Sequence, residues 1–181
     1  HMKITKLKKT MTKNRVIDYS IKFITGDWQG SGVDAALIKK AIIAALEANG
    51  NNENNNLALA VVLADDKFIQ DHNREFRSKD KPTNVLAFRQ IPMLGNQQEF
   101  SWPESEPTEL GDIIVAYETV CREAKEACIS FNQHFSHLLI HGVLHLLGYE
   151  HDNDEDAEIM QSAEVSALTL IGYPSPYQNE I

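Results

Sequence analysis

The residues best suited to chemistry in this chain are three histidines near its C-terminal end. His141 and His145 are four residues apart, and a helix through them would place both imidazoles on one face, about 6 Å apart. Gly148 can end such a helix, because glycine accepts the positive φ that a helix C-terminus often needs, and His151 can then turn back toward the pair. Three nitrogen ligands leave one position of a tetrahedral zinc ion open, which is typical of catalytic sites. The spacing therefore predicts a hydrolytic metal centre.

Two further histidines, His134 and His137, fall on the same stripe of the expected helix. His137 and His141 could also chelate a metal, but His137 and His145 would be about 12 Å apart along a helix, too far to share one ion. We therefore expect the metal ligands to be His141, His145 and His151. The other two would be polar groups around the site. Nitrogen ligation favours one zinc ion, although affinity alone would also allow nickel, copper or another first-row metal.

The histidine spacing also matches the metzincin peptidase pattern, His-Glu-x-x-His-x-x-Gly-x-x-His, in which a glutamate follows the first histidine as the general base. In this chain the corresponding position is Gly142. A peptidase of this kind would lack the group that activates its water. The residues alone therefore favour a metal-dependent hydrolase, and they leave open a metallopeptidase-like hydrolase with a displaced general base.

The histidines need a helix to hold them, and hydrophobic periodicity predicts one from about Phe131 to Leu147. Strands alternate with helices in the rest of the chain, which indicates an α/β (α+β) class with a mixed sheet of about four strands flanked by helices. The metal site would lie at the end of a central helix. The expected strands are 16–23, 57–64, 85–88 and 110–116, and the expected helices are 34–48, 67–76, 119–127, 131–147 and 154–171.

The length of 181 residues and the hydrophobic content of 43% suit one domain with one core. We expect the hydrolase domain at residues 16–177 and a short tail at 178–181. A basic segment at 1–15 precedes the domain, and His1 within it resembles a cloning remnant. Residues 90–109 are polar and rich in proline, which predicts a long loop or a hairpin tip. No apolar run reaches the length of a membrane span, so we expect a cytoplasmic protein with no membrane partner.

The net charge of −9 argues against a protein that coats nucleic acid nonspecifically, but the charges are unevenly distributed. Lysines and arginines gather at residues 3–15 and again at 74–81. Acidic residues follow the histidines, between positions 150 and 158. An anionic substrate would therefore approach from the basic side.

Three stretches resemble motifs of one bacterial family, the YbeY endoribonucleases, also called ribosomal RNA maturation factors. Residues 141–151, His-Gly-Val-Leu-His-Leu-Leu-Gly-Tyr-Glu-His, resemble its metal motif. Residues 76–88, Phe-Arg-Ser-Lys-Asp-Lys-Pro-Thr-Asn-Val-Leu-Ala-Phe, are similar to its second signature, and residues 110–113, Leu-Gly-Asp-Ile, to its third. The three motifs follow the family's order, and the resemblance covers roughly residues 57–177.

The resemblance implies a zinc-dependent endoribonuclease that cleaves single-stranded RNA in the 3′-end maturation of small-subunit ribosomal RNA and in ribosome quality control. Its implied partners are ribosomal RNA, the small ribosomal subunit and an assembly GTPase. It also implies that Arg77 stabilises charge on the reacting phosphate, since a guanidinium offers paired donors to phosphate oxygens. A structural salt bridge is the alternative for Arg77. A non-catalytic assembly factor with structural zinc is the alternative for the protein.

The remaining candidate residues carry weaker signals. Lys79 and Lys81 would bind RNA phosphates or stay solvated. Asp112 and Glu150 are candidates for groups behind the metal ligands, and together with Asp152 they are the candidates for the general base. The family usually has aspartate where this chain has Glu150, so a role of that aspartate does not transfer directly to the longer side chain.

Overall fold

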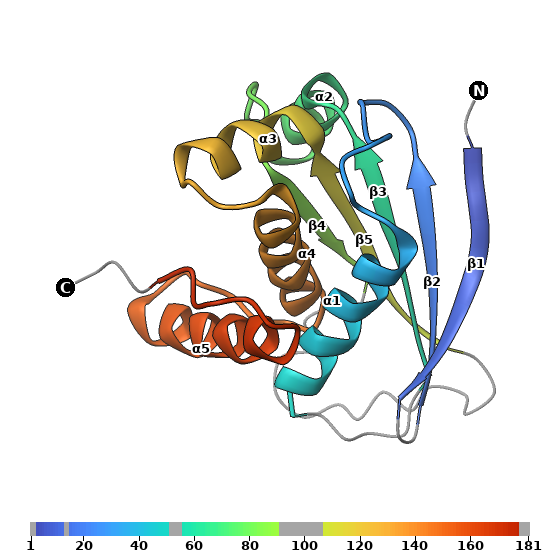
Figure 1. Cartoon of the computed structure of the whole chain (residues 1–181), viewed down its shortest axis with the longest axis vertical. Coiled ribbons are helices and arrows are strands. Elements are labelled where there is room, and N and C mark those ends of the chain that lie inside the picture. Colours follow the sequence, from blue (N-terminus) through green and yellow to red (C-terminus); the bar gives the residue numbers. More distant parts are fainter. Residues whose placement is uncertain (1–2, 13–14, 51–55, 91–106, 178–181) are drawn as a thin grey trace.

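The computed structural model describes residues 3–12, 15–50, 56–90 and 107–177. These residues form a mixed five-stranded sheet in the order β1-β2-β3-β5-β4, with helices on both faces (Figure 1). β3 is parallel to both of its neighbours, whereas the edge strands β1 and β4 are antiparallel to theirs. The strands are β1 (Lys3–Thr12), β2 (Arg15–Phe23), β3 (Leu57–Ala64), β4 (Val85–Arg89) and β5 (Thr108–Ala116).

The middle strand, β3, explains why the sheet forms where it does. All eight residues of β3 are buried, and its sequence is a continuous apolar run because helices cover both faces of the sheet. Alternating apolar residues in β2 instead bury one face, with Ile17, Tyr19 and Ile21 in the core. The expected α/β class with a mixed sheet is therefore confirmed.

The helices begin close to the residues that the sequence predicts. The Asp34 side chain accepts a hydrogen bond from the Leu37 amide (2.8 Å), and the Ser130 side chain accepts one from the Gln133 amide (3.1 Å). Such caps satisfy amides that would otherwise lack partners in the first turn. Among the described residues, no helix has both the length and the apolar character to cross a membrane. The helices are α1 (Ala35–Ala48), α2 (Asp66–Arg77), α3 (Tyr117–Glu126), α4 (Phe131–Leu146) and α5 (Asp154–Leu170).

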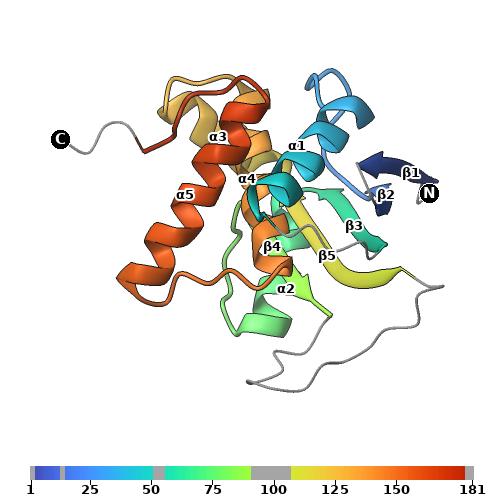
Figure 2. The same ribbon diagram turned by 90° about the horizontal axis from the view of Figure 1, so that it is seen from below.

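The two faces of the sheet carry different helices (Figures 1 and 2). α1 and α4 cover one face, α5 packs on both of these helices, and the three build the larger core, which includes Ile38, Phe135 and Leu168. α2 covers the other face, where Ile69 packs against Ile114 in a smaller core. α4 contacts α1, α3 and α5 as well as β4 and β5, so it is the central helix of its layer.

One strand was not expected from the sequence. Lys3–Thr12 pairs antiparallel with β2 and gives the sheet its fifth strand. Four of its ten residues are lysine, which is typical of edge strands because the charges oppose pairing with another strand. The lysines also hide the alternation of apolar residues by which a strand is recognised in the sequence. β5 begins at Thr108, slightly before the expected residue 110. Most of the expected loop at 90–109 lies outside the described residues.

Candidate metal centre

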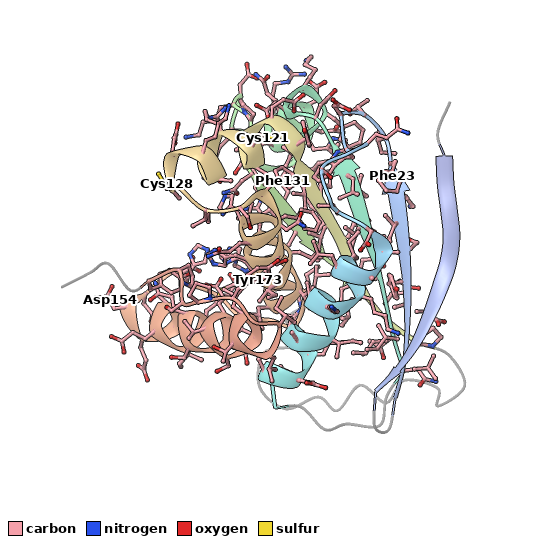
Figure 3. The ribbon with its side chains drawn as sticks, viewed as in Figure 1. Phe23, Cys121, Cys128, Phe131, Asp154 and Tyr173 are labelled. Carbon is pink, nitrogen blue, oxygen red and sulfur yellow. The ribbon has the colours of Figure 1, made fainter. Side chains whose placement is uncertain are left out.

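The C-terminal end of α4 carries two of the three predicted ligands. His141 and His145 occupy consecutive turns, and their Nε2 atoms are 3.0 Å apart. Gly148 adopts a φ of 100° just after the helix, and the Tyr149 amide bonds back to the last turn (3.0 Å). His151 lies in the connection between α4 and Asp154, which begins α5 and is labelled in Figure 3. One side-chain nitrogen from each of the three histidines lies within 4.8 Å of the others, so the three could hold one ion.

The ring orientations of the two α4 histidines suit a metal. Nδ1 of His145 donates to the Tyr149 carbonyl (2.9 Å), and Nδ1 of His141 donates to the Glu164 carboxylate. With the proton on Nδ1, each Nε2 keeps its lone pair, and the two lone pairs converge on one point where a cation would separate them. Burial, together with the neighbouring His141, lowers the pKa of His145 to about 4, so this ring is neutral at pH 7, as a ligand must be.

A buried acid on α5, Glu164, supports the histidines. It is 1% exposed, and its carboxylate accepts hydrogen bonds from Nε2 of His137 (3.2 Å), from His141 and from the phenol of Tyr177. Burial alone would raise the pKa of Glu164, but the bonds from His137 and His141 lower it to about 2. The carboxylate is therefore ionised at neutral pH, and it fixes the orientation of His141.

Neither Glu164 nor Tyr177 was identified from the sequence. Glu164 lies within the apolar stripe of α5, beside the buried Met160, Ala167 and Leu168. An acid on such a stripe is a signal for a buried partner, because carboxylates are almost never buried unpaired. Tyr177 had no comparable local signal, since its partners come from α4 and α5.

The other two histidines of α4 lie outside the three-histidine cluster. Nε2 of His134 lies 2.6 Å from the Glu123 carboxylate, which also accepts a bond from Asn84 Nδ2 (3.0 Å). His137 is bound to Glu164. Both are polar groups outside the cluster, as the separations of eight residues for His137 and eleven for His134 from His145 imply.

The cluster opens into a cavity of about 320 Å³ with two walls. The histidine wall consists of α4 residues together with His151 and Tyr177, and the basic wall consists of Arg77 with Thr83 and β4 residues. α2 ends at Arg77, and Ser78 follows it with a φ of 54°. The Arg77 side chain lines the cavity, and its Nη2 donates to the Ala87 carbonyl (3.3 Å). The cavity thus places a guanidinium and a potential metal site around one space.

Gly142, between the two α4 ligands, lies against the sheet. A Cβ atom at this position would be 2.8 Å from Cγ2 of Ile113 on β5, closer than side chains pack. A glutamate here, as in metzincin peptidases, would require either the Ile113 side chain or α4 to shift. The packing at this position therefore favours glycine, in agreement with the sequence pattern.

The candidate carboxylates differ in their distance from the cluster. Oε2 of Glu150 lies 3.9 Å from Nδ1 of His145, so Glu150 adjoins the ligands. Asp112 is two residues before Ile114 and shares its face of β5, which packs on α2 and is opposite to α4. Asp152 is exposed in the turn before α5. The structure thus brings Glu150, and not Asp112, next to the histidines.

The two candidate lysines lie on the segment that joins α2 to β4. Asn73 of α2 is buried, and its Nδ2 donates to the Lys81 carbonyl (2.8 Å) while its own carbonyl accepts from the Lys79 amide (3.2 Å). The backbone of this segment is therefore anchored, whereas both lysines are exposed. Among the described residues, neither lysine is part of the cavity lining.

Comparisons with known proteins identify relatives over most of the chain. The family Endoribonuclease YbeY matches residues 24–172. The chain is 42% identical over 170 residues to the endoribonuclease YbeY of Bradyrhizobium diazoefficiens, which covers 93% of this chain and 90% of that protein. It is 44% identical over 122 residues to that of Magnetococcus marinus, covering 67% of this chain and 83% of that protein.

Among solved structures, the chain is similar to the solution structure of TM1509 from Thermotoga maritima, with 25% identity and a TM-score of 0.48 over 82% of this chain and 89% of that one. The matched residues 24–172 include both the histidine cluster and Arg77. From the family match and the identity to its members, the chain belongs to the endoribonuclease YbeY family.

Proposed function

We propose that this protein is a zinc-dependent endoribonuclease that cleaves single-stranded RNA and matures the 3′ end of small-subunit ribosomal RNA. The observation that carries the proposal is the convergence of His141, His145 and His151 beside Arg77 in one cavity. Family membership supports RNA as the substrate. A zinc ion bound by the three histidines would supply a Lewis acid for a phosphoryl oxygen and an acidified water.

The protein's own groups have separate tasks in this proposal. Glu164 holds the Nδ1 proton of His141, and the Tyr149 carbonyl holds that of His145, so that the Nε2 atoms stay available as ligands. Burial raises the pKa of Tyr177, and the bond to Glu164 raises it further, so its phenol stays protonated and acts as a donor only. Neither Glu164 nor Tyr177 is therefore the general base.

Arg77 stabilises the negative charge that grows on the phosphate. A guanidinium has five N–H donors, and the Ala87 carbonyl engages one of them, so paired donors can face a phosphate from the basic wall. Glu150 adjoins His145 on the Nδ1 side of the ring, away from Nε2, and is not among the described residues that line the cavity, so it supports this ligand and is not placed to take a proton from the attacking group. The Arg77 guanidinium and the three histidines would then act on the same phosphodiester from the two walls of the cavity.

The cellular role that follows is processing of ribosomal RNA on the small ribosomal subunit, with an assembly GTPase as partner, and removal of defective ribosomes in quality control. The cytoplasm is the compartment that this role requires. The exposed Lys79 and Lys81 supply positive charge near Arg77 that would attract the RNA backbone.

The test is a cleavage assay with three substrates. Zinc-loaded protein should cut a single-stranded oligoribonucleotide and leave the matching duplex and casein intact, and a chelator should stop the reaction until zinc is restored. The ends of the products separate two chemistries, because only attack by the RNA 2′-hydroxyl passes through a cyclic phosphate. Cleavage of casein without cleavage of RNA would overturn the proposal in favour of a peptidase.

A further inference from the structure

α2 carries a row of aromatic rings on one side. Phe68, His72 and Phe76 follow at intervals of four residues, which places them on one stripe of the helix. The centroids of Phe68 and His72 are 4.4 Å apart with the rings stacked, and those of His72 and Phe76 are 5.9 Å apart. The row ends at Phe76, whose ring also meets Phe88 of β4 edge to face at 5.4 Å.

The last ring of the row is held in place and yet open to solvent. Phe76 is 60% exposed, although His72 and Phe88 contact it. Contacts on two sides restrict the rotamer of the ring, so little further entropy is lost when something binds to its open surface. This combination suits a fixed platform for a flat partner.

The position of Phe76 relative to the cavity identifies that partner. Phe76 and Arg77 are consecutive, with Cα atoms about 3.8 Å apart. They contact consecutive residues of the edge strand: Phe76 meets Phe88, and Arg77 donates to the Ala87 carbonyl. A ring that can stack on a base therefore belongs to the residue directly before Arg77, whose guanidinium lines the cavity, and both residues contact the same edge strand.

The charges around the ring favour a polyanion. Arg74 is engaged by Asp71 (2.9 Å) and Asp80 (3.6 Å), whereas Lys79 and Lys81 are exposed. Glu75 is the remaining acid of the stretch 74–81, so four cations face two acids there. A ring beside an excess of positive charge matches the way proteins bind single-stranded nucleic acid, with bases on aromatic side chains and phosphates on lysine and arginine.

We propose that the exposed ring of Phe76 stacks on an unpaired base of the RNA, adjacent to the phosphate bound by Arg77. This inference rests on the proposed function and adds a base-binding site to it. A base in a duplex is already stacked on both faces, so the platform accepts only RNA whose bases are free. Phe76 thereby contributes to the preference for single strands without reading a sequence, because every base has a π face.

The experiment compares Phe76→Ala and Phe76→Trp with wild type, and uses Leu170→Ala as the matched control. Leu170 is 57% exposed on α5, so its removal deletes a similar apolar surface away from the cavity. Binding of a labelled single-stranded oligoribonucleotide is followed by stopped-flow anisotropy before cleavage occurs. The Kd should rise about tenfold to hundredfold in Phe76→Ala and stay near wild type in Phe76→Trp and Leu170→Ala.

A second set of oligoribonucleotides lacks one base at a time. At one position, loss of the base should raise the Kd of wild type by the same factor as Phe76→Ala does with the intact RNA. The same loss should leave the Kd of Phe76→Ala unchanged, because ring and base form one contact. The inference is overturned if Phe76→Ala leaves the Kd unchanged. It is also overturned if, at every position, loss of the base raises the Kd of wild type and of Phe76→Ala by the same factor. Absence of RNA cleavage by wild type overturns the proposed function instead, and the binding measurement still decides about Phe76.

Discussion

The histidine wall and the basic wall of the cavity hold their functional groups to different degrees. On the histidine wall, His141 and His145 each have Nδ1 bonded to a partner, and the partner of His141, Glu164, is itself buried. On the basic wall, Arg77 is exposed at the end of α2, and it donates one hydrogen bond, to the Ala87 carbonyl (3.3 Å). The nearby Lys79 is also exposed to solvent.

The difference follows from what each wall is proposed to bind. A metal ion needs ligands with fixed tautomers and directions, which only buried, hydrogen-bonded partners supply. A wall that binds phosphate must exchange water for substrate and then release product, so its cations stay at the surface. Substitutions on the two walls should therefore have separable effects, on zinc binding for one and on RNA binding and turnover for the other.

The largest effect on the basic wall is expected for Arg77→Ala. Loss of the guanidinium should reduce kcat about 100-fold to 1000-fold, because charge on the phosphate loses its stabilising donors. The kcat of Arg77→Lys should lie between those of wild type and Arg77→Ala, since an ammonium keeps the charge but lacks the paired donors. Zinc content, measured by atomic absorption, should equal that of wild type in both variants, and loss of zinc in either would break the separation of the walls.

On the histidine wall, Glu164→Gln should weaken zinc binding about tenfold to hundredfold, because a neutral amide no longer holds the Nδ1 proton of His141 with a charge. The affinity is measured by competition with a chelating dye. Gln161→Ala, an exposed substitution on the same helix, is the control and should leave the affinity unchanged. Equal zinc affinity in Glu164→Gln and wild type would refute the role of the buried acid.

The smallest effects are expected for Lys79→Ala and Lys81→Ala. Each should raise the Kd for RNA a few-fold and reduce the slope of log affinity against log salt by about 0.7 for each phosphate that the protein no longer neutralises. Lys40→Ala on α1, also exposed, should alter neither quantity. If the lysine variants keep the wild-type salt slope, these lysines are solvated charges that do not contact RNA phosphates.

Local patterns predicted much of the fold and of the histidine wall. His141, His145 and Gly148 lie close together in the sequence. Helix geometry and the turn at the glycine were therefore enough to indicate that the two rings would converge with His151. The apolar run at Leu57–Ala64 likewise indicated a central strand. β1 was missed because its lysines conceal the pattern on which strand prediction depends.

Features that depend on contacts between distant elements could not be predicted in the same way. Glu164 meets His141 across the interface of α4 and α5, and Tyr177 joins them from beyond α5. Asp112 was a reasonable candidate from its motif, but the alternation of side chains along β5 directs it to the face that packs on α2. Which face of the sheet α4 would cover was not determined by the motif.

The most direct test of the account is zinc analysis combined with RNA cleavage on wild type, His145→Ala and His134→Gln. His134 belongs to the same helix but is bonded to Glu123 outside the cluster, so its variant controls for the loss of a histidine from α4. Wild type and His134→Gln should bind zinc and cleave single-stranded RNA, whereas folded His145→Ala should do neither. Cleavage at the wild-type rate by a zinc-free, folded His145→Ala would contradict the account.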